Sequence, residues 1–165
     1  MAKAEIIDCV TVTITDGNGN ITRQFTEKNT LTNGDPTTTY NGRVMMLMTL
    51  SGDDDGGSIG MDSSSVLDNM QLGTGTADNT GLQTPITAAP TTTEIAATLV
   101  WDYTTPSQPK ITYTCVWDST FDALTVSEAV LYNDFNDVFA YKNFSPALTK
   151  TTDGTIQIDW SITIT

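Results

Sequence analysis

Residues 155–165, TIQIDWSITIT, alternate strictly between apolar and polar side chains. Because successive side chains of a β-strand point to opposite faces of its sheet, a period of two this regular predicts a strand with one buried face. The buried face would carry Ile156, Ile158, Trp160, Ile162 and Ile164. The sequence therefore predicts a sheet that includes its last residues, and we expect truncation there to be badly tolerated.

The same alternation recurs along the chain. Val10, Val12 and Ile14 alternate with threonines, and the DGNGN stretch at 16–20 then predicts a hairpin turn, because Asn-Gly and Asp-Gly tolerate positive backbone torsions. The polar and proline-containing stretch at 104–110 predicts a second hairpin connection. Further strands are predicted at 97–103, 111–117, 124–132 and 138–144.

Threonine accounts for 32 of the 165 residues. It is β-branched and suits a pleated surface that faces water. Many short strands predict an all-β fold, an antiparallel β-sandwich of jelly-roll or immunoglobulin-like strand order. The pattern does not choose between these orders, since it predicts strands but not their pairing. No linker separates two units, so we expect one domain over 1–165.

One segment does not alternate. Val44 to Leu50 contains three methionines and two leucines, which favour a helix, and Thr37 to Thr39 are candidate N-caps. We therefore predict one short helix near 39–50, with Gly52 ending it.

Charge and hydropathy exclude several partners. The chain has 20 acidic and 7 basic residues, a net charge of −13, and its basic residues are scattered. Nucleic acids and anionic membranes are recognised by clustered positive charge, so neither is an expected partner. No apolar stretch approaches the roughly 20 residues that span a bilayer. The first ten residues lack the features of a signal peptide, and we expect a soluble protein.

Several kinds of catalytic chemistry are excluded by the absence of histidine, which removes every Ser-His and Cys-His pair. Cys9 and Cys115 stand far apart in strand-like contexts and are expected to be free thiols. We expect neither an enzyme nor a cofactor.

The GTGT stretch at 73–76 raises the question of a phosphate-binding loop. It lacks the third glycine of a dinucleotide-binding motif and the lysine of a P-loop, and no helix pattern follows it. The sequence therefore predicts a loop that only turns the chain.

Two acidic stretches are weak candidates for metal binding. Asp16, Asn18, Asn20 and Glu27 match positions 1, 3, 5 and 12 of a calcium loop, but Ile21 replaces the glycine required at position 6. Asp53, Asp54 and Asp55 are adjacent carboxylates that we expect to be solvated. We expect no bound metal at either stretch.

Glu128 is an acidic residue within the apolar run VSEAVLY. A structural hydrogen bond at a strand is favoured over acid-base chemistry there. Trp101, Trp117 and Trp160 all fall on the apolar phase of predicted strands, so we expect core residues rather than a platform for stacking sugars.

Five segments, taken in order, resemble small β-sandwich proteins of tailed-bacteriophage structural gene clusters, which serve as head decoration (cement) proteins or as tail-fibre and baseplate components. Val130 and Tyr132 stand where the family has glycine and phenylalanine. The resembling segments are NTLTNGD (29–35), NGRVMMLMTLSG (41–52), MQLGTGTADNTGLQTPI (70–86), VSEAVLYND (126–134) and FAYKNFSPALTKTTDGTIQIDWSITIT (139–165).

The resemblance implies a non-enzymatic virion protein, assembled in the host cytoplasm, that binds the major capsid protein on the outer capsid surface as a homotrimer. The alternatives are a tail-fibre, baseplate or adaptor component that binds tail proteins, and a carbohydrate-binding module displayed on the virion. The expected partner contacts are the N-terminal arm and the acidic loop, that is Met1, Ala2, Lys3, Ala4, Glu5, Asp53, Asp54 and Asp55.

Overall fold

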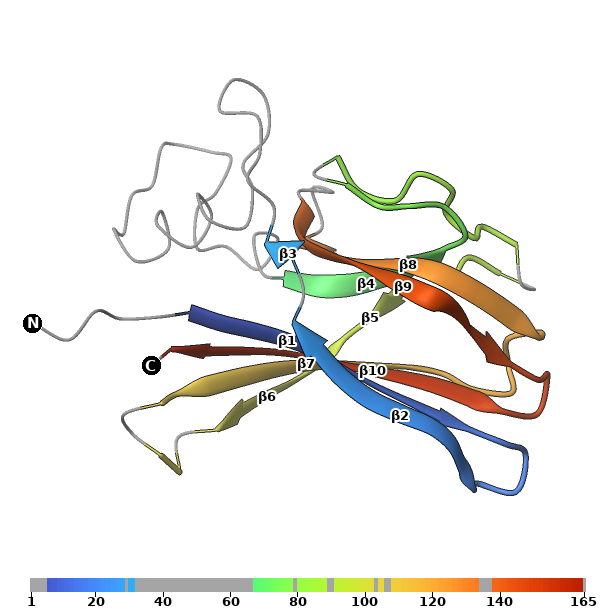
Figure 1. The fold of residues 1–165 in the computed structure, drawn as a ribbon, viewed down its shortest axis with the longest axis horizontal. Helices are drawn as coiled ribbons and strands as arrows, with labels where there is room; N and C mark the ends of the chain where they lie inside the picture. Colours follow the sequence, from blue (N-terminus) through green and yellow to red (C-terminus); the bar gives the residue numbers. More distant parts are fainter. Residues whose placement is uncertain are drawn as a thin grey trace, which may run out of the picture.

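Two antiparallel sheets of five strands each pack face to face in a β-sandwich (Figure 1). The computed structural model describes residues 6–28, 30–31, 67–78, 80–88, 91–102, 104–105, 108–133 and 138–164. Within these ranges the chain is all-β and contains no helix, as the alternation of the sequence predicts. The helix predicted near 39–50 lies outside the described residues.

Sheet 1 has its C-terminal strand at its centre. Every β1–β10 pair joins residues of the same phase, from Ile6 opposite Ile164 to Thr15 opposite Thr155, so the apolar phases of the two strands share one face. The expected sensitivity to C-terminal truncation has a structural basis, because β10 pairs with two neighbours. The strand order is β2 (Ile21–Lys28), β1 (Ile6–Thr15), β10 (Thr155–Ile164), β7 (Lys110–Trp117) and β6 (Thr98–Asp102).

Sheet 2 is centred on a strand that is buried on both faces. A register shift between Val126 and Glu128 changes which residues of β8 point inward: Val126 faces the core before it, and Ala129 and Leu131 face the core after it. Val130 and Tyr132 therefore lie on the outer face, in a small second cluster. The strand order is β3 (Thr30–Leu31), β9 (Val138–Lys150), β8 (Leu124–Asn133), β4 (Leu67–Gly73) and β5 (Ile95–Ala96).

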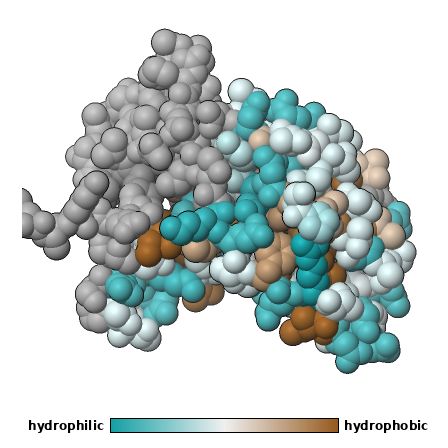
Figure 2. Space-filling model, viewed as in Figure 1, coloured by the Kyte–Doolittle hydropathy of each residue, from teal (hydrophilic) through white to brown (hydrophobic). Residues whose placement is uncertain are grey.

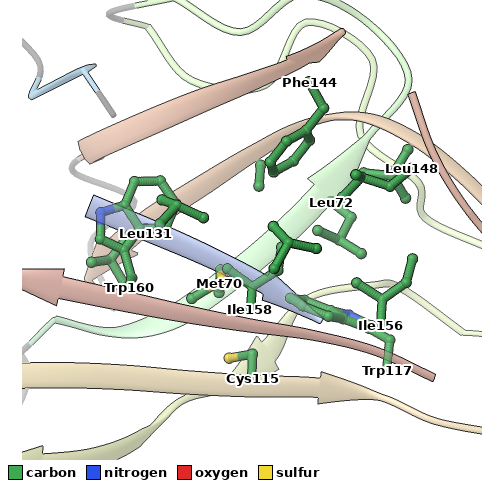
Figure 3. Close-up of a cluster of buried hydrophobic side chains, with 14 of the residues drawn as sticks. Met70, Leu72, Cys115, Trp117, Leu131, Phe144, Leu148, Ile156, Ile158 and Trp160 are labelled. Atoms are coloured by element: carbon green, nitrogen blue, oxygen red, sulfur yellow. The ribbon is translucent and has the colours of Figure 1, made fainter. Parts of the chain in front are cut away.

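The core lies between the sheets and draws on the inward phases of both (Figure 3). Trp117 and Trp160 are fully buried, as the sequence predicts, and each indole N–H has an acceptor. Trp117 Nε1 donates to the Thr93 carbonyl at 2.7 Å, and Trp160 Nε1 donates to Asp8 Oδ1 at 2.9 Å. These bonds satisfy donors that burial would otherwise leave without a partner.

The outer face of sheet 1 carries cross-strand hydroxyl pairs, as the threonine content predicts. Thr11 Oγ1 lies 2.8 Å from Thr26 Oγ1, between β1 and β2. On the same face, between β7 and β10, Thr114 Oγ1 donates to Asp159 Oδ1 at 2.7 Å. Such pairs fix side-chain rotamers and add a few tenths of a kcal/mol each, up to about 1.

We predict that Trp160→Phe lowers the free energy of unfolding by about 2 kcal/mol or more, because it leaves the buried Asp8 carboxylate without the indole donor and leaves a small cavity. Trp101→Phe is the matched control. Trp101 is 55% exposed, so its loss should cost less than about 1 kcal/mol. Urea unfolding followed by circular dichroism measures both, and equal losses would contradict the prediction.

Both cysteines are free, as expected, and Cys115 is buried whereas Cys9 is half-buried. Burial raises the pKa of the Cys115 thiol from 9.0 to about 12 and that of Tyr113 from 10.0 to about 12. The unfolded chain therefore loses these protons first as the pH rises. Well below pH 9 both groups are protonated in the folded and the unfolded chain, so neither makes the free energy of unfolding depend on pH. Between the unfolded and the folded pKa of each group, the free energy of unfolding falls as the pH rises.

We predict that the free energy of unfolding attributable to Cys115 falls as the pH rises from 9 toward 12, by up to about 1.4 kcal/mol per pH unit. Burial lowers the pKa of Lys150, which acts in the opposite direction as the pH rises toward 10.5. The difference between the wild type and Cys115→Ala therefore isolates the thiol. Denaturant titrations at a series of pH values should show this difference shrinking above pH 9, and a constant difference would contradict the prediction.

Candidate interaction surface

Residues 73–78 and 80–86 fold back over the outer face of sheet 2, and we call them the covering loop. The loop is closed where its ends meet: Thr74 N–H donates to the Thr84 carbonyl at 2.9 Å, and Ile86 N–H donates to the Leu72 carbonyl at 3.0 Å. Within the loop, Leu82 packs on the outer cluster of Val130, Tyr132 and Val138. This cover explains why β8 is buried on both faces.

A buried carboxylate holds the covering loop in place. Glu128 is fully buried, and its carboxylate accepts three backbone N–H groups of the loop. Oε1 accepts from Gly75 at 2.9 Å and from Thr84 at 2.8 Å, while Oε2 accepts from Gln83 at 3.1 Å. A buried carboxylate is tolerated when it is fully hydrogen-bonded, and these amides supply that environment.

The glycines of GTGT are required by this close approach. A Cβ on Gly73 would collide with Glu128 Oε1 and would lie 2.7 Å from the Thr84 carbonyl oxygen. A Cβ on Gly75 would lie 2.9 Å from Glu128 Oε1. Glycine at both positions therefore lets the backbone reach the carboxylate.

Two further side chains of sheet 2 bind the loop backbone. Asn143 lies opposite Glu128 in the β8–β9 register. Its Oδ1 accepts Ala77 N–H at 2.8 Å, and its Nδ2 donates to the Ala77 carbonyl at 2.9 Å, as a neighbouring strand would. Ser127 Oγ donates to the Gly75 carbonyl at 2.7 Å.

The far end of the loop is fixed by Asp78. Its Oδ1 accepts Thr80 N–H at 2.8 Å, Thr80 Oγ1 at 2.7 Å and Gln83 Nε2 at 3.1 Å. The hydrogen bond from the Thr80 hydroxyl, together with that from its N–H, holds the pKa of Asp78 below its usual value. Gly81 adopts a φ of 109°, a left-handed conformation that favours glycine.

The GTGT loop is therefore structural, as the sequence predicts, and Glu128 makes structural hydrogen bonds. The loop does wrap an anion, but the anion is a side chain of the same protein. The result is a loop that is hydrogen-bonded to sheet 2 and whose exposed side chains are mostly polar. Its exposed residues are Thr74, Thr76, Asp78, Thr80, Gln83, Thr84 and Pro85.

Trp101 does not lie in the core, which corrects the sequence-based expectation. It has the inward phase of β6, opposite Ile111, but its side chain is 55% exposed. Its neighbours Leu99 and Val100 are also exposed, at 38% and 54%. On the face shown in Figure 2, the coloured residues are mostly hydrophilic or of intermediate hydropathy, with small separate hydrophobic patches. The sequence pattern therefore places Trp101 on the correct face of β6, but it does not predict that this part of the face is exposed to solvent.

The residues of the calcium-like pattern do not converge. Asp16 accepts hydrogen bonds from Asn18 N–H and from Asn20 N–H and Nδ2, within the β1–β2 turn. The side-chain bond from Asn20 contributes most to holding the pKa of Asp16 below its usual value. Glu27 lies opposite Val10, about 20 Å along the strand from the turn, and forms an ion pair with Lys142 at 2.7 Å.

The other predicted contacts, Met1 to Glu5 and Asp53 to Asp55, lie outside the described residues. Among the residues that the structure does describe, no group of three or more histidine, cysteine, aspartate or glutamate side chains is placed to hold a metal ion. The same residues include no helix long and apolar enough to cross a membrane.

Comparisons with protein-family models, with curated proteins and with solved structures found no match to this chain.

We predict that Glu128→Gln loosens the covering loop and lowers the free energy of unfolding by about 1–3 kcal/mol, because the amide NH₂ turns a donor toward one of the backbone N–H groups that the carboxylate accepts. Hydrogen exchange should show faster exchange at the N–H groups of Gly75, Gln83 and Thr84. Residues of β10 should keep their protection. Unchanged exchange in the loop would show that the carboxylate does not hold it.

Proposed function

We propose that this protein is a non-enzymatic structural protein of a tailed-bacteriophage virion that binds the outer surface of the capsid and stabilises contacts between capsid subunits. The resemblance of 29–165 to head decoration and tail proteins supports the virion role. The observation that supports binding to the capsid surface is the covering loop. The buried carboxylate of Glu128 holds this loop against sheet 2, and the polar side chains of the loop face solvent.

An ordered loop is well suited to this role because binding then loses little conformational entropy. A flexible loop of the same length would have to be immobilised on contact with its partner. Apart from Pro85, the exposed side chains of the loop carry hydroxyl, amide and carboxylate groups, which form hydrogen bonds across an interface with a polar protein surface. A net charge of −13 further favours a partner surface with basic patches.

We predict that Thr76→Lys, on the exposed part of the covering loop, weakens binding to undecorated capsid shells by at least about tenfold, because it places a positive charge at the contact. Asn18→Lys is the matched control: it makes the same change in charge on the exposed β1–β2 turn. Co-sedimentation with purified shells measures both. Equal weakening by the two variants would remove the loop from the contact.

Binding should also weaken as the salt concentration rises, since acidic residues would face basic capsid patches.

Copy number in purified particles separates the head role from the tail alternative. A simple large fraction of the major capsid protein supports decoration, and a few copies to a few dozen support a tail-fibre, baseplate or adaptor component. Absence from particles would contradict the virion role.

A second candidate function, carbohydrate binding, is favoured by the exposed indole of Trp101. An exposed tryptophan on a strand offers a flat surface on which a sugar ring stacks. The adjacent Asp102 and Thr104 supply polar groups, although Asp102 Oδ1 already accepts the Thr104 N–H and hydroxyl at 2.9 and 2.6 Å. A glycan array that binds the wild type but not Trp101→Ala would support this function, and an array without binding would exclude it.

A further inference from the structure

The two edge strands of sheet 1 differ in how they are protected. Edge strands present a row of backbone hydrogen-bonding groups, and proteins limit unwanted pairing there with bulges and charged side chains. β2 has both. A register shift interrupts its pairing between Ile14 and Thr15, and it carries Arg23, Glu27 and Lys28.

β2 is also tied to sheet 2 by its charged groups. Arg23 Nη1 donates to the Ala147 carbonyl at 3.4 Å, and Lys142 Nζ binds both Glu27 Oε2 and the Lys28 carbonyl, at 2.7 and 2.9 Å. These contacts close that side of the sandwich.

β6, at the opposite edge, is less protected, because Asp102 is its one charged side chain. Its sequence is Thr98-Leu99-Val100-Trp101-Asp102, without a cation, proline or register shift. Among the residues that the structure describes, no strand pairs with the outer edge of β6, and every residue of β6 is exposed. Exposed apolar side chains on an edge strand are typical of strands that add to another strand.

The sequence of β6 is complementary to itself. When two copies are aligned antiparallel about Val100, Val100 faces its own counterpart, Leu99 faces Trp101, and Thr98 faces Asp102. Within each pair the two side chains lie on the same face of the joined sheet. Each aspartate lies opposite a threonine and not opposite the other aspartate. Cross-strand pairs of an aromatic with an aliphatic residue, and of a hydroxyl with a carboxylate, are stabilising, whereas like charges in opposition are not.

Neighbouring registers are worse matched. Alignment about Leu99 would set Trp101 opposite Ala97, and alignment about Trp101 would set Asp102 opposite Val100. Of these three registers, only the one centred on Val100 sets Leu99 opposite Trp101 and also sets Thr98 opposite Asp102.

We propose that β6 pairs antiparallel with β6 of a second copy of this chain, about a two-fold axis at Val100, so that the two copies of sheet 1 form one continuous sheet. The net charge of −13 on each copy opposes association, and salt therefore strengthens the dimer. The pairing uses the edge of sheet 1 and leaves the covering loop of sheet 2 exposed. It predicts a two-fold assembly, in contrast to the homotrimer that the family resemblance implies.

Sedimentation velocity of the full chain, from low micromolar to millimolar concentration and at low and high salt, tests the pairing. We expect a monomer–dimer equilibrium that shifts to dimer as salt rises. Val100→Lys should weaken it at least about tenfold, since the two-fold axis sets the two lysines opposite each other. Val116→Lys is the matched control, because Val116 is 41% exposed but lies on β7, away from the edge.

A monomer under all conditions, a trimer, or equal weakening by both variants would overturn the proposal. An independent variant, Val100→Cys in a Cys9→Ser background, is tested with oxidised glutathione. Directly opposed residues of antiparallel strands lie within disulfide distance, so thiol–disulfide exchange should yield a covalent dimer and release reduced glutathione. Val116→Cys should remain monomeric, and equal crosslinking of the two variants would count against β6 pairing.

Discussion

The carboxylate of Glu128 has no access to water, so all its hydrogen bonds must come from within the protein. The backbone of the covering loop provides three of them. That requirement fixes the path of the loop, requires glycine at Gly73 and Gly75, and places Leu82 over Val130. The apolar outer face of β8 is in turn kept from solvent because the loop lies over it. A polar interaction thus determines where a second, smaller apolar cluster can form.

The two sheets bury their residues in different ways. Sheet 1 has one apolar face and one face with hydroxyl and carboxylate pairs, so its central strands β1 and β10 alternate cleanly between buried and partly exposed residues. β8 of sheet 2 is covered on both faces, and its residues 128–133 are all buried, including the apolar residues 129–132. Glu128 belongs to neither apolar cluster, because its carboxylate binds the covering loop.

The strands of sheet 1 could be predicted from the sequence because alternation reports the face of each residue, and Trp160 and Trp117 are buried accordingly. Trp101 has the same phase, yet it is exposed. Phase does not report whether another layer covers that face, and this depends on the lateral position of β6. The roles of Asn143 and Ser127 could not be predicted, because they depend on a loop more than 40 residues away along the chain. The signal available was a glycine-rich loop together with one acidic residue in an apolar run.

The pairing of β1 with β10 has a consequence for how the chain folds. The partners Ile7 and Thr163 are separated by almost the whole chain, and β10 lies between β1 and β7. During synthesis the β1–β2 hairpin can form early, but β1 and β7 cannot join one sheet until β10 has left the ribosome. Their apolar faces must remain separate until then, so folding is delayed by topology and the early strands depend on their threonine-rich faces to stay soluble.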